Sequence, residues 1–499
     1  MKITVRHKSA KDYTGDVLIV NLFQGVKTPG GATGVIDKAL NGSISRLIKK
    51  GELSGKLGET VMVHTFGKLR AERVLIVGLG KKEQFDINAI RKAAAAAIQH
   101  AEKVNAHKVG TIVHGAGIGG IAPDSAAQAV AEGTILAQYR FTEFRNLEKT
   151  AVTECAIIEI DKKKIPVIQK GAKTGIIVAE SQCVSRDLTN TPSNILTPRA
   201  FAQKIKARIK KEGLVKRIRY KVLDKTAMKK MGMGALLSVS QGSINDPCFI
   251  TLRCTNPGKP LVCLIGKTVT FDSGGISLKP AQHMGLMKGD MSGGGVVFAV
   301  TLALARARAR VNLLTIIPAV ENMPSGSASR PGDVVTAMNG KTIEIISTDA
   351  EGRMTLADSL CYAEKMKAQT VIDIATLTGG CVVALGDVAA AVMGKDQKLI
   401  DELIAVSERT GERFWQLPLF EEYKKQIKSD IADLKNSGGR KASAITAGLF
   451  LQSFVDKARW VHIDIAGKEI AENAHFYTPK GGTGFGVRTL FEFVRQAGT

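Results

Sequence analysis

The stretch from 261 to 275 reads LVCLIGKTVTFDSGG and decides which fold this chain adopts. Its first five residues, Leu261–Ile265, form an uninterrupted apolar run, which is typical of a buried strand in a parallel sheet. The Gly266-Lys267-Thr268 that follows resembles the end of a phosphate-binding loop. Such a loop requires a glycine five positions before Gly266, but that position is Leu261. The strand therefore runs directly into Gly266, and no phosphate-binding loop is predicted here. Leu261 also disfavours a nucleotide-dependent enzyme, which would have to show measurable binding of ATP or NAD.

Polar clusters follow the other predicted strands of this half of the chain. The strands are predicted at 342–346 and 370–374, and the helices at 293–310 and from about 354 to 367. Asp272 follows the first strand, and Asp290 precedes the first of these helices. The segments STDAEGR at 347–353 and TLTGG at 376–380 follow the two other strands. Because ligands bind at the carboxyl edge of an open α/β sheet, we expect these clusters to lie close together.

The clusters contain four carboxylates, those of Asp272, Asp290, Asp349 and Glu351. Four negative charges in a partly dry cleft would repel one another strongly. Two divalent cations would neutralise them, which favours a dinuclear site for Mn²⁺, Mg²⁺ or Zn²⁺. A buried lysine beside two cations loses its proton, so Lys267 is predicted to bind a metal as a neutral amine. The alternative is that these residues are ordinary turn aspartates and a surface lysine.

The chain is predicted to contain two domains, because 499 residues exceed one ordinary core. Strands are predicted in the first half at 17–22, 74–79 and 109–114, and helices at 86–106 and within 125–139. This alternation indicates an α/β domain with a mainly parallel sheet. The charged segment 161–164 and Pro166 mark a boundary near 165, and a helix is predicted over 175–189. The predicted parts are an N-terminal domain at 1–165, a linker helix region at 166–185 and a larger domain at 186–499.

A glycine-rich segment in the N-terminal half matches the pattern of a dinucleotide-binding turn. It reads HGAGIGG at 114–120 and lies between a predicted strand and a predicted helix. A dinucleotide site also needs an acidic residue at the end of the next strand, about 20 residues further on. Glu143 stands at that distance but follows a helix. Tight packing of a strand-to-helix turn explains the glycines, so a cofactor site is not predicted here.

The formal net charge of the chain is +24, and it is unevenly distributed. The segment 199–230 has 13 lysines and arginines against Glu212 and Asp224, a local charge of +11. Such a patch could attract nucleic acid or another polyanion, and the alternative is a solvated helix and strand surface. No recognisable DNA- or RNA-reading motif accompanies the charge.

The remaining composition predicts a cytoplasmic protein that does not enter the membrane. No apolar run reaches the roughly 18 to 20 residues that span a bilayer, and the first residues lack the apolar core of a secretory signal. The seven cysteines are scattered without a CxxC pair, which is typical of reduced thiols and not of a disulfide framework or a cysteine zinc site.

Several ordered motifs resemble the leucyl aminopeptidase family of cytosolic dinuclear-metal peptidases. The family signature Asn-Thr-Asp-Ala-Glu-Gly-Arg-Leu is matched by STDAEGRM at 347–354, and its metal-binding segment by GKTVTFDSGGISLKP at 266–280 and MKGDMSG at 287–293. Further similar stretches lie at 187–198, 232–243, 321–335, 375–380, 429–439 and 477–488. The resemblance covers roughly 180–495, with a looser likeness in the N-terminal domain.

The resemblance implies a fold and a set of site residues. The fold is two α/β domains, an N-terminal macro-like domain and a larger metallopeptidase domain with a mainly parallel, mixed central sheet flanked by helices. The implied metal ligands are Lys267, Asp272, Asp290, Asp349 and Glu351. The implied catalytic residues are Lys279 and Arg353, and the implied substrate-binding residues are Met287, Thr376, Leu377 and Gly379. Family members usually form hexamers.

The resemblance also implies a chemistry, the removal of leucine or another apolar residue from the N-terminus of a peptide. Two metal ions, Mn²⁺ or Zn²⁺, would activate a water molecule, and Lys279 would stabilise the charge that develops on the tetrahedral gem-diolate. Arg353 would hold a bicarbonate ion as the general base. His283 lies between these segments, but the family pattern predicts no catalytic role for it. A DNA-binding architectural protein on a peptidase fold, using 199–230, is the alternative.

This sequence departs from the family pattern at three positions. Thr268 replaces the usual glycine after the ligand lysine, which would strain the backbone if that position needs a positive φ. Ser347 replaces asparagine beside the metal loop and shortens a polar side chain. Met354 replaces leucine with a side chain of similar volume. Because the implied ligand and catalytic positions are intact, we expect activity, with an altered KM or metal preference.

Overall fold

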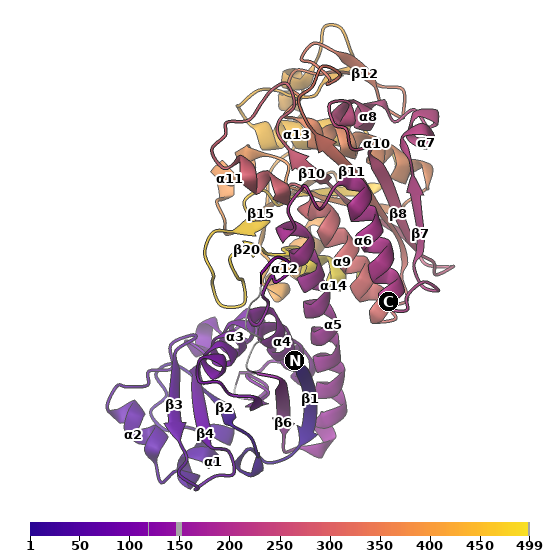
Figure 1. Cartoon of the computed structure of the whole chain (residues 1–499). Helices are drawn as coiled ribbons and strands as arrows, with labels where there is room; N and C mark the ends of the chain where they lie inside the picture. The colour runs from indigo at the N-terminus through magenta and orange to yellow at the C-terminus, as the bar shows by residue number, and fades with distance from the viewer. Residues whose placement is uncertain (118, 146–151, 498–499) are drawn as a thin grey trace. The chain divides into compact units, whose positions relative to one another are not determined.

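The computed structural model describes residues 1–117, 119–145 and 152–497. The chain forms two compact units, drawn in Figure 1. The N-terminal unit contains Met1–Glu180 with Arg409–Gly411 and Asn473–Lys480, and the C-terminal unit contains most of the remainder. Helix α5, Ile165–Asn190, contains the predicted linker region, and the two units divide within it, between Glu180 and Ser181. The predicted two-domain α/β fold is confirmed.

The N-terminal unit is built on a six-stranded sheet in the order β1-β6-β5-β2-β4-β3. All neighbouring pairs are parallel except β3 with β4. The strands are β1 Lys2–His7, β2 Val17–Leu22, β3 Thr60–His64, β4 Arg73–Gly78, β5 Lys108–Ile112 and β6 Glu154–Glu159. Three of them coincide within a residue or two with the strands predicted at 17–22, 74–79 and 109–114.

Helices cover both faces of this sheet, because alternate strand residues point to opposite sides. One core contains Leu18, Val20 and Ile158 and packs against α1 Gly31–Ala39 and α2 Ser43–Lys49. The other contains Val113 and Ile157 and packs against α3, α4 and α5. Helix α3, Ile87–Lys103, starts at the N-cap Asp86, whose side chain accepts a hydrogen bond from the N–H of Ala89. Helix α4 is Pro123–Ala137.

A buried histidine gives the N-terminal unit a predictable sensitivity to acid. Burial lowers the pKa of His114 from its ordinary 6.5 to about 4. The unfolded chain therefore binds a proton between these pH values that the folded chain does not bind, and stability falls as pH drops from 6.5 to 4. We expect His114→Gln to remove up to about 3 kcal/mol of this pH-dependent loss. Urea unfolding of both proteins at pH 4.5 and 7, monitored through the hydrogen exchange of α3 and α4, checks this. An equal loss of unfolding free energy in both proteins between the two pH values would contradict it.

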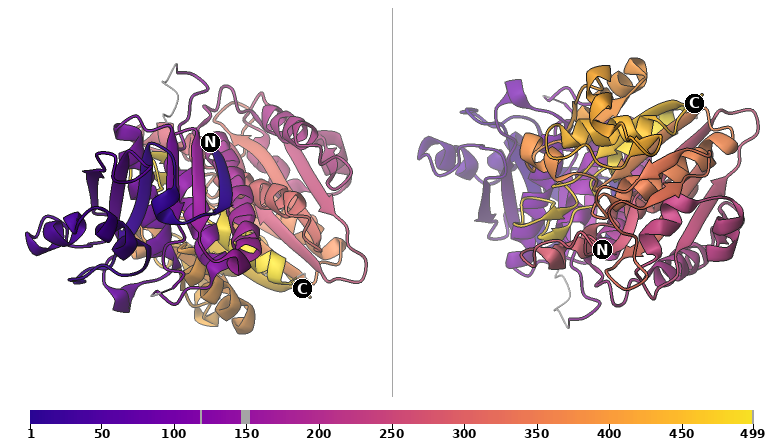
Figure 2. Two further views of the ribbon diagram at one scale, coloured as in Figure 1. Left: turned by 90° about the horizontal axis from the view of Figure 1, so that it is seen from below. Right: turned by 90° about the horizontal axis from the view of Figure 1, so that it is seen from above.

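The C-terminal unit is built on a nine-stranded mixed sheet (Figures 1 and 2). Its order is β16-β15-β18-β14-β9-β11-β8-β7, with β10 paired to β11. The central strands β18, β14, β9 and β11 are parallel, while β8, β7 and β15 run antiparallel to their inner neighbours. The strands are β7 Arg219–Leu223, β8 Cys248–Cys254, β9 Leu261–Gly266, β10 Thr268–Asp272, β11 Asn312–Asn322, β14 Thr370–Ala375, β15 Ala390–Gly394, β16 Phe414–Gln416 and β18 Arg459–Asp464.

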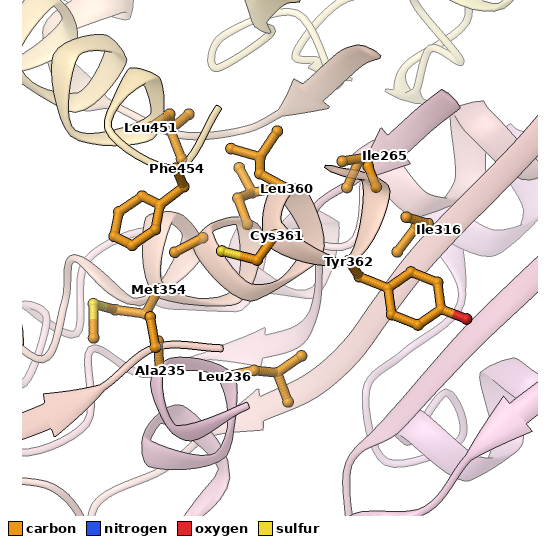
Figure 3. Close-up of a cluster of buried hydrophobic side chains, with 14 of the residues drawn as sticks. Ala235, Leu236, Ile265, Ile316, Met354, Leu360, Cys361, Tyr362, Leu451 and Phe454 are labelled. Carbon is orange, nitrogen blue, oxygen red and sulfur yellow. The ribbon is translucent and has the colours of Figure 1, made fainter. Parts of the chain in front are cut away.

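Helices α9 and α14 pack on one face of this sheet, and α8, α10 and α13 pack on the other. Their bounds are α8 Gly234–Ser240, α9 Ser292–Arg306, α10 Glu351–Lys365, α13 Ser443–Gln452 and α14 Val487–Ala497. Figure 3 shows the core between the second group and the sheet, in which Met354 and Leu360 of α10 lie near Leu236 and Ile265. This packing fixes the first turn of α10 relative to the end of β9.

The strand predicted at 342–346 does not belong to the central sheet. It forms the shorter β13, Thr342–Glu344, in a separate sheet with β12 Val334–Thr336 and β17 Leu434–Lys435. The expectation that every polar cluster follows a strand of one open sheet is therefore wrong for 347–353. Helix α10 also begins at Glu351, three residues earlier than predicted, so Glu351 and Arg353 lie in its first turn.

The basic segment 199–230 forms α6 Pro198–Lys211, β7 and α7 Lys225–Lys230. Most of its lysines are exposed, and its use in nucleic-acid binding stays a prediction. The seven cysteines are all free thiols, and most are buried. Among the described residues, no helix combines the length and the apolar character that a membrane span requires.

Candidate metal centre

Lys267 follows β9 at the point where the order of the central sheet reverses. The chain continues from β9 to β11 on one side and then crosses to β14 on the other, so the carboxyl end of β9 lies at a topological switch point. The buried Lys267 donates from Nζ to the carbonyl of Thr376 at 2.7 Å. It also forms ion pairs with Asp290 at 2.9 Å and Glu351 at 2.8 Å.

Asp272 and Asp290 reach this point from the two ends of the β10–α9 connection. Asp272 is the last residue of β10, and its Oδ1 accepts hydrogen bonds from the N–H of Gly274 at 2.9 Å and from Asn322 at 2.8 Å. Asp290 precedes α9, and its Oδ1 accepts a hydrogen bond from Thr376 at 2.6 Å. Its Oδ2 is buried without a hydrogen-bond partner among the described atoms.

Glu351 completes a compact cluster of three buried carboxylates. One ligand atom each from Asp272, Asp290 and Glu351 lies within 4.8 Å of the others. Glu351 reaches the cluster because the backbone of α10 passes very close to Lys267. A Cβ at Gly352 would lie 2.6 Å from the Lys267 side chain, so only glycine fits there.

Asp349 joins the cluster from the loop before α10 and is partly exposed. It is linked to Asp272 by Lys279, whose Nζ forms ion pairs with Asp272 at 2.8 Å and with Asp349. The structure thus gathers all five implied metal ligands and Lys279. When all four carboxylates are ionised, the ammonium groups of Lys267 and Lys279 offset only half of their charge of −4.

Burial dominates the electrostatics of these groups. It raises the pKa of Asp290 well above its usual range, against the opposing charge of Lys267. It also raises the pKa of Asp272, where the charge of Glu351 adds to the effect, and the pKa of Asp349. For Lys267, burial acts to lower the pKa, but Asp290 and Glu351 outweigh burial and the pKa rises. In the absence of metal ions, Lys267 is therefore held as an ammonium ion.

Arg353 lies two residues beyond Glu351 on α10 and is buried. It donates from Nη1 to the carbonyl of Asn436 at 2.7 Å, while its Nε is buried without a partner among the described atoms. Burial lowers the pKa of Arg353 to about 10, which still leaves it charged at neutral pH. A fixed cation with unused donors is suited to holding a small anion.

The four implied substrate-binding residues lie in two segments next to the carboxylates. Met287 belongs to the 3-10 turn Met284–Gly289, and its carbonyl accepts a hydrogen bond from the N–H of Asp290 at 3.2 Å. Thr376 contacts Asp290, and Leu377 follows it. Gly379 is the first residue of α11, Gly379–Leu385, and a Cβ added there would meet no atom within 4 Å.

The three departures from the family pattern are accommodated locally. Thr268 lies in β10 and does not have a positive φ, so its side chain does not strain the backbone there. Its hydroxyl donates to the carbonyl of Gly266 at 2.8 Å. The hydroxyl of Ser347 accepts a hydrogen bond from the N–H of Asp349 at 3.2 Å. Met354 is buried in the core. His283 is an exposed loop residue with a φ of 64°.

Three polar residues that support the site were not singled out from the sequence. Asn322 ends β11 and holds Asp272, and Asp464 ends β18 and accepts hydrogen bonds from the N–H of Leu377 at 3.0 Å and the hydroxyl of Thr378 at 2.7 Å. Both stand at the carboxyl ends of parallel strands, which is the signal that could have identified them. The third, Asn436, follows a two-residue strand and gives no such signal.

Asn436 is expected to be important because its side chain holds the loop that carries Asp349. It accepts hydrogen bonds from the N–H groups of Ile346 at 2.8 Å and Ser347 at 3.3 Å, and donates to the carbonyl of Ser347 at 2.7 Å. We expect Asn436→Ala to lower metal affinity and kcat/KM by about 10- to 100-fold. Metal titration and peptide-amide turnover check this, with Asn339→Ala in an exposed turn as control. Unchanged metal affinity would contradict it.

Comparison with known proteins is consistent with this geometry. The model of the cytosol aminopeptidase family catalytic domain matches residues 183–491, and that of the family's N-terminal domain matches 19–147. The chain is 40% identical over 501 residues to a probable cytosol aminopeptidase of Alkaliphilus oremlandii, covering 99% of both chains. It is 41% identical over 464 residues to one of Geobacter sulfurreducens, covering 92% of both.

Two solved structures are similar over nearly the whole chain. A tomato leucine aminopeptidase mutant has a TM-score of 0.88 at 32% identity, covering 99% of this chain and 96% of that one. The bottromycin maturation enzyme BotP in complex with Mn has a TM-score of 0.86 at 34% identity, covering 97% of this chain and all of that one.

Proposed function

Because this chain belongs to the cytosol aminopeptidase family, we propose that it removes N-terminal residues, preferentially leucine and other apolar ones, from peptides by a two-metal mechanism. The observation that carries the proposal is the convergence of four carboxylates and one buried lysine at the switch point of the central sheet. The bacterial relatives and the tomato enzyme support an aminopeptidase reaction, and the carboxylate cluster supports the metal requirement.

The residues fit two divalent cations. The donors would be Lys267, Asp272, Asp290, Asp349 and Glu351. With Lys267 deprotonated as a ligand, Lys279 offsets one of the four negative charges, and the remaining −3 is a charge that two divalent cations would neutralise. The unpartnered Oδ2 of Asp290 is a free donor atom inside the cluster. A set of carboxylates with one amine suits Mn²⁺ or Zn²⁺. Since an amine must lose its proton to bind metal, metal uptake would release protons.

Bound metals would supply a water of lowered pKa and would polarise the scissile carbonyl. Besides the metals, the protein would place one positively charged side chain, that of Lys279, near the same carbonyl. Lys279 is partly exposed and reaches the cluster from the loop after β10. Burial acts to lower its pKa, but the charges of Asp272, Glu351 and Asp349 together raise it, so Lys279 keeps its proton. We assign Lys279 to stabilising the negative charge that develops on the substrate oxygen as it becomes tetrahedral.

Arg353 would hold a bicarbonate ion that serves as the general base. Its buried Nε and its charge support this assignment, because a guanidinium binds a planar anion through two parallel N–H groups. The hydrogen bond to the carbonyl of Asn436 keeps the side chain from turning away. No histidine is required, and the exposed His283 has no assigned role.

Met287, Thr376, Leu377 and Gly379 would form the site for the first residue of the substrate. Asp464 fixes this segment by holding the backbone of Leu377 and the hydroxyl of Thr378. Because the Gly379 position leaves open space, the site would accept a branched apolar side chain. Substitutions here would change KM between substrates more than kcat.

We also propose a homohexamer, as the family resemblance implies. Large apolar side chains are exposed on the C-terminal unit, among them Val383 at 90%, Ile431 at 66% and Trp415 at 65%. Exposed apolar groups of this size commonly lie in interfaces between subunits. Analytical ultracentrifugation of the purified chain tests this proposal, and a monomer at micromolar concentration would contradict it.

The direct test of the proposed function is turnover of leucyl-p-nitroanilide by protein loaded with Mn²⁺ or Zn²⁺. We expect release of nitroaniline that stops on chelation and returns when metal is added back. N-acetylated leucyl anilide is the matched control and should not react, since an aminopeptidase needs a free α-amine. Absence of turnover in protein shown to contain two metals per chain would contradict the proposal.

A further inference from the structure

The N-terminal unit contains a cavity of about 500 Å³ at the carboxyl edge of its sheet. Its lining includes Asn21 and Leu22 from the end of β2, and Ile112 and Val113 from the end of β5. A cavity of this size can enclose an organic ligand with a ring system, because small-molecule sites range from about 300 to 1,000 Å³. Neither the peptidase reaction nor the metal cluster uses this cavity.

The cavity lies at the topological switch point of the N-terminal sheet. From β2 the chain continues to β3 and β4 on one side of it, whereas β5 and β6 lie on the other side. Strands β2 and β5 are parallel neighbours, so the connections that leave their carboxyl ends diverge. In open α/β sheets this divergence opens the crevice in which ligands bind.

Packing explains only part of the glycine-rich segment that follows β5. A Cβ at Gly115 or Gly119 would lie 2.5 or 2.6 Å from the ring of Phe85, so glycine is needed at both positions. At Gly117, by contrast, φ is not positive and a Cβ would meet no atom within 4 Å. Gly117 lines the cavity, where the lack of a side chain leaves the backbone open to a ligand. Ile118 lies outside the described residues.

The opposite wall of the cavity offers donors for an anion. Helix α1 begins at the N-cap Gly30, where no side chain caps it, and Gly30 to Thr33 all line the cavity. The first N–H groups of a helix have no intrahelical partner and favour phosphate. Lys8 and Lys164 also line the cavity. Lys8 adds positive charge there, whereas the ammonium of Lys164 lies 3.8 Å from a carboxylate oxygen of Asp161.

An acidic residue is present where a nucleotide site requires one. Glu159 ends β6, the strand that follows β5 in the sequence and pairs with it, and it lines the cavity. One carboxylate oxygen accepts a hydrogen bond from the N–H of Asp161 at 2.8 Å. A carboxylate at the end of the second strand can accept hydrogen bonds from ribose hydroxyls. A distance of about 20 residues from the glycines leads only to Glu143, because β6 does not begin until Glu154.

The rim of the cavity is apolar and exposed. Val35 of α1 is 45% exposed and Ile160 after β6 is 69% exposed, although both line the cavity. Phe23 and Leu79 form part of the interior wall. Apolar surface beside anion donors matches a ligand with a flat base at one end and phosphate at the other.

We propose that the N-terminal unit binds a nucleoside diphosphate at this switch-point cavity. The phosphates lie against Gly117 and the start of α1, the ribose lies near Glu159, and the base lies against the apolar rim. The site is separate from the carboxylate cluster, and the chain carries it in addition to its peptidase chemistry.

The test is calorimetric titration of the full metal-loaded chain with ADP. We expect a dissociation constant between about 1 µM and 1 mM, and at least about tenfold weaker binding of adenosine, which lacks the phosphates. Gly117→Asp adds a carboxylate in open space beside the phosphates and should weaken ADP binding at least about tenfold. Its matched control is Phe66→Asp, which adds the same charge to the exposed β3–β4 turn at the opposite edge of the sheet.

Leucyl-anilide turnover should be the same in both variants and in the wild type, which shows that the metal centre is intact. If thermal melting shows that Gly117→Asp does not fold, Val35→Asp at the exposed rim replaces it. No heat of binding at about 1 mM ADP would overturn the proposal. Equal binding of ADP by wild type and the folded cavity variant would also overturn it, because ADP would then occupy another site.

Discussion

Asp290→Ala is expected to lower kcat/KM for leucyl-p-nitroanilide by on the order of 10³-fold, about 4 kcal/mol of transition-state stabilisation. Asp290 is buried, its Oδ2 has no protein partner among the described atoms, and its Oδ1 joins Lys267 to Thr376. Removing it deletes one of the three buried carboxylates whose ligand atoms lie within 4.8 Å of one another. We therefore expect fewer than two metal ions per chain, measured by plasma emission spectroscopy on dialysed protein, together with the loss of turnover.

A folding control separates the chemical role of Asp290 from a structural one. Asp290→Ala leaves the buried Lys267 ammonium with one carboxylate partner fewer, so the metal-free variant should melt lower than the metal-free wild type. The variant should nevertheless be folded at the assay temperature. Asp430→Ala removes an exposed aspartate of the same unit and should leave both metal content and turnover unchanged. Two bound metals and full activity in Asp290→Ala would refute the assignment.

Lys279→Met is expected to lower kcat by on the order of 10²- to 10³-fold while KM changes by no more than a few-fold. The ammonium group acts on charge that exists only in the transition state, so its loss should affect the chemical step and not substrate binding. Methionine retains much of the side-chain length without the charge. Steady-state kinetics of leucyl-p-nitroanilide hydrolysis over a range of substrate concentrations measures the two constants separately.

Metal content distinguishes this role from that of a ligand. Lys279 forms ion pairs with Asp272 and Asp349, so replacing it makes the cluster more negative. Lys279→Met should therefore keep two metals per chain and bind them at least as tightly as the wild type. Lys425→Met, on an exposed turn, is the control. A variant that loses metal along with activity would show that Lys279 organises the cluster and would contradict a transition-state role.

The central part of the fold was predictable because its signals are local. The apolar run before Gly266 identified β9, since a strand buried on both faces is nearly continuously apolar. The mainly apolar stretch at 370–374, which Asp373 interrupts, identified β14. Lys267, Asp272, Asp290 and 376–380 could then be placed at one edge from chain order alone. The strand at 342–346 was misassigned to that sheet, because three residues of β13 look the same in the sequence whichever sheet they join.

The supporting residues depended on contacts between distant parts of the chain. Asn436 binds the loop before α10 across more than 80 residues, and no pattern near it indicates this. The same holds for Glu159, which is brought to the cavity by the pairing of β6 with β5 and not by its spacing from the glycines.

The sequence by itself determined the α/β class, the strand that ends at Lys267 and the types of residue available for metal chemistry. These follow from hydrophobic periodicity and from charges that must be balanced, both of which are local properties. The tertiary structure alone decided which oxygen atoms lie within reach of one another, which carboxylate has a free lone pair and where the N-terminal cavity opens. Such distances depend on how strands pair and how helices pack, and those interactions join residues far apart in the chain.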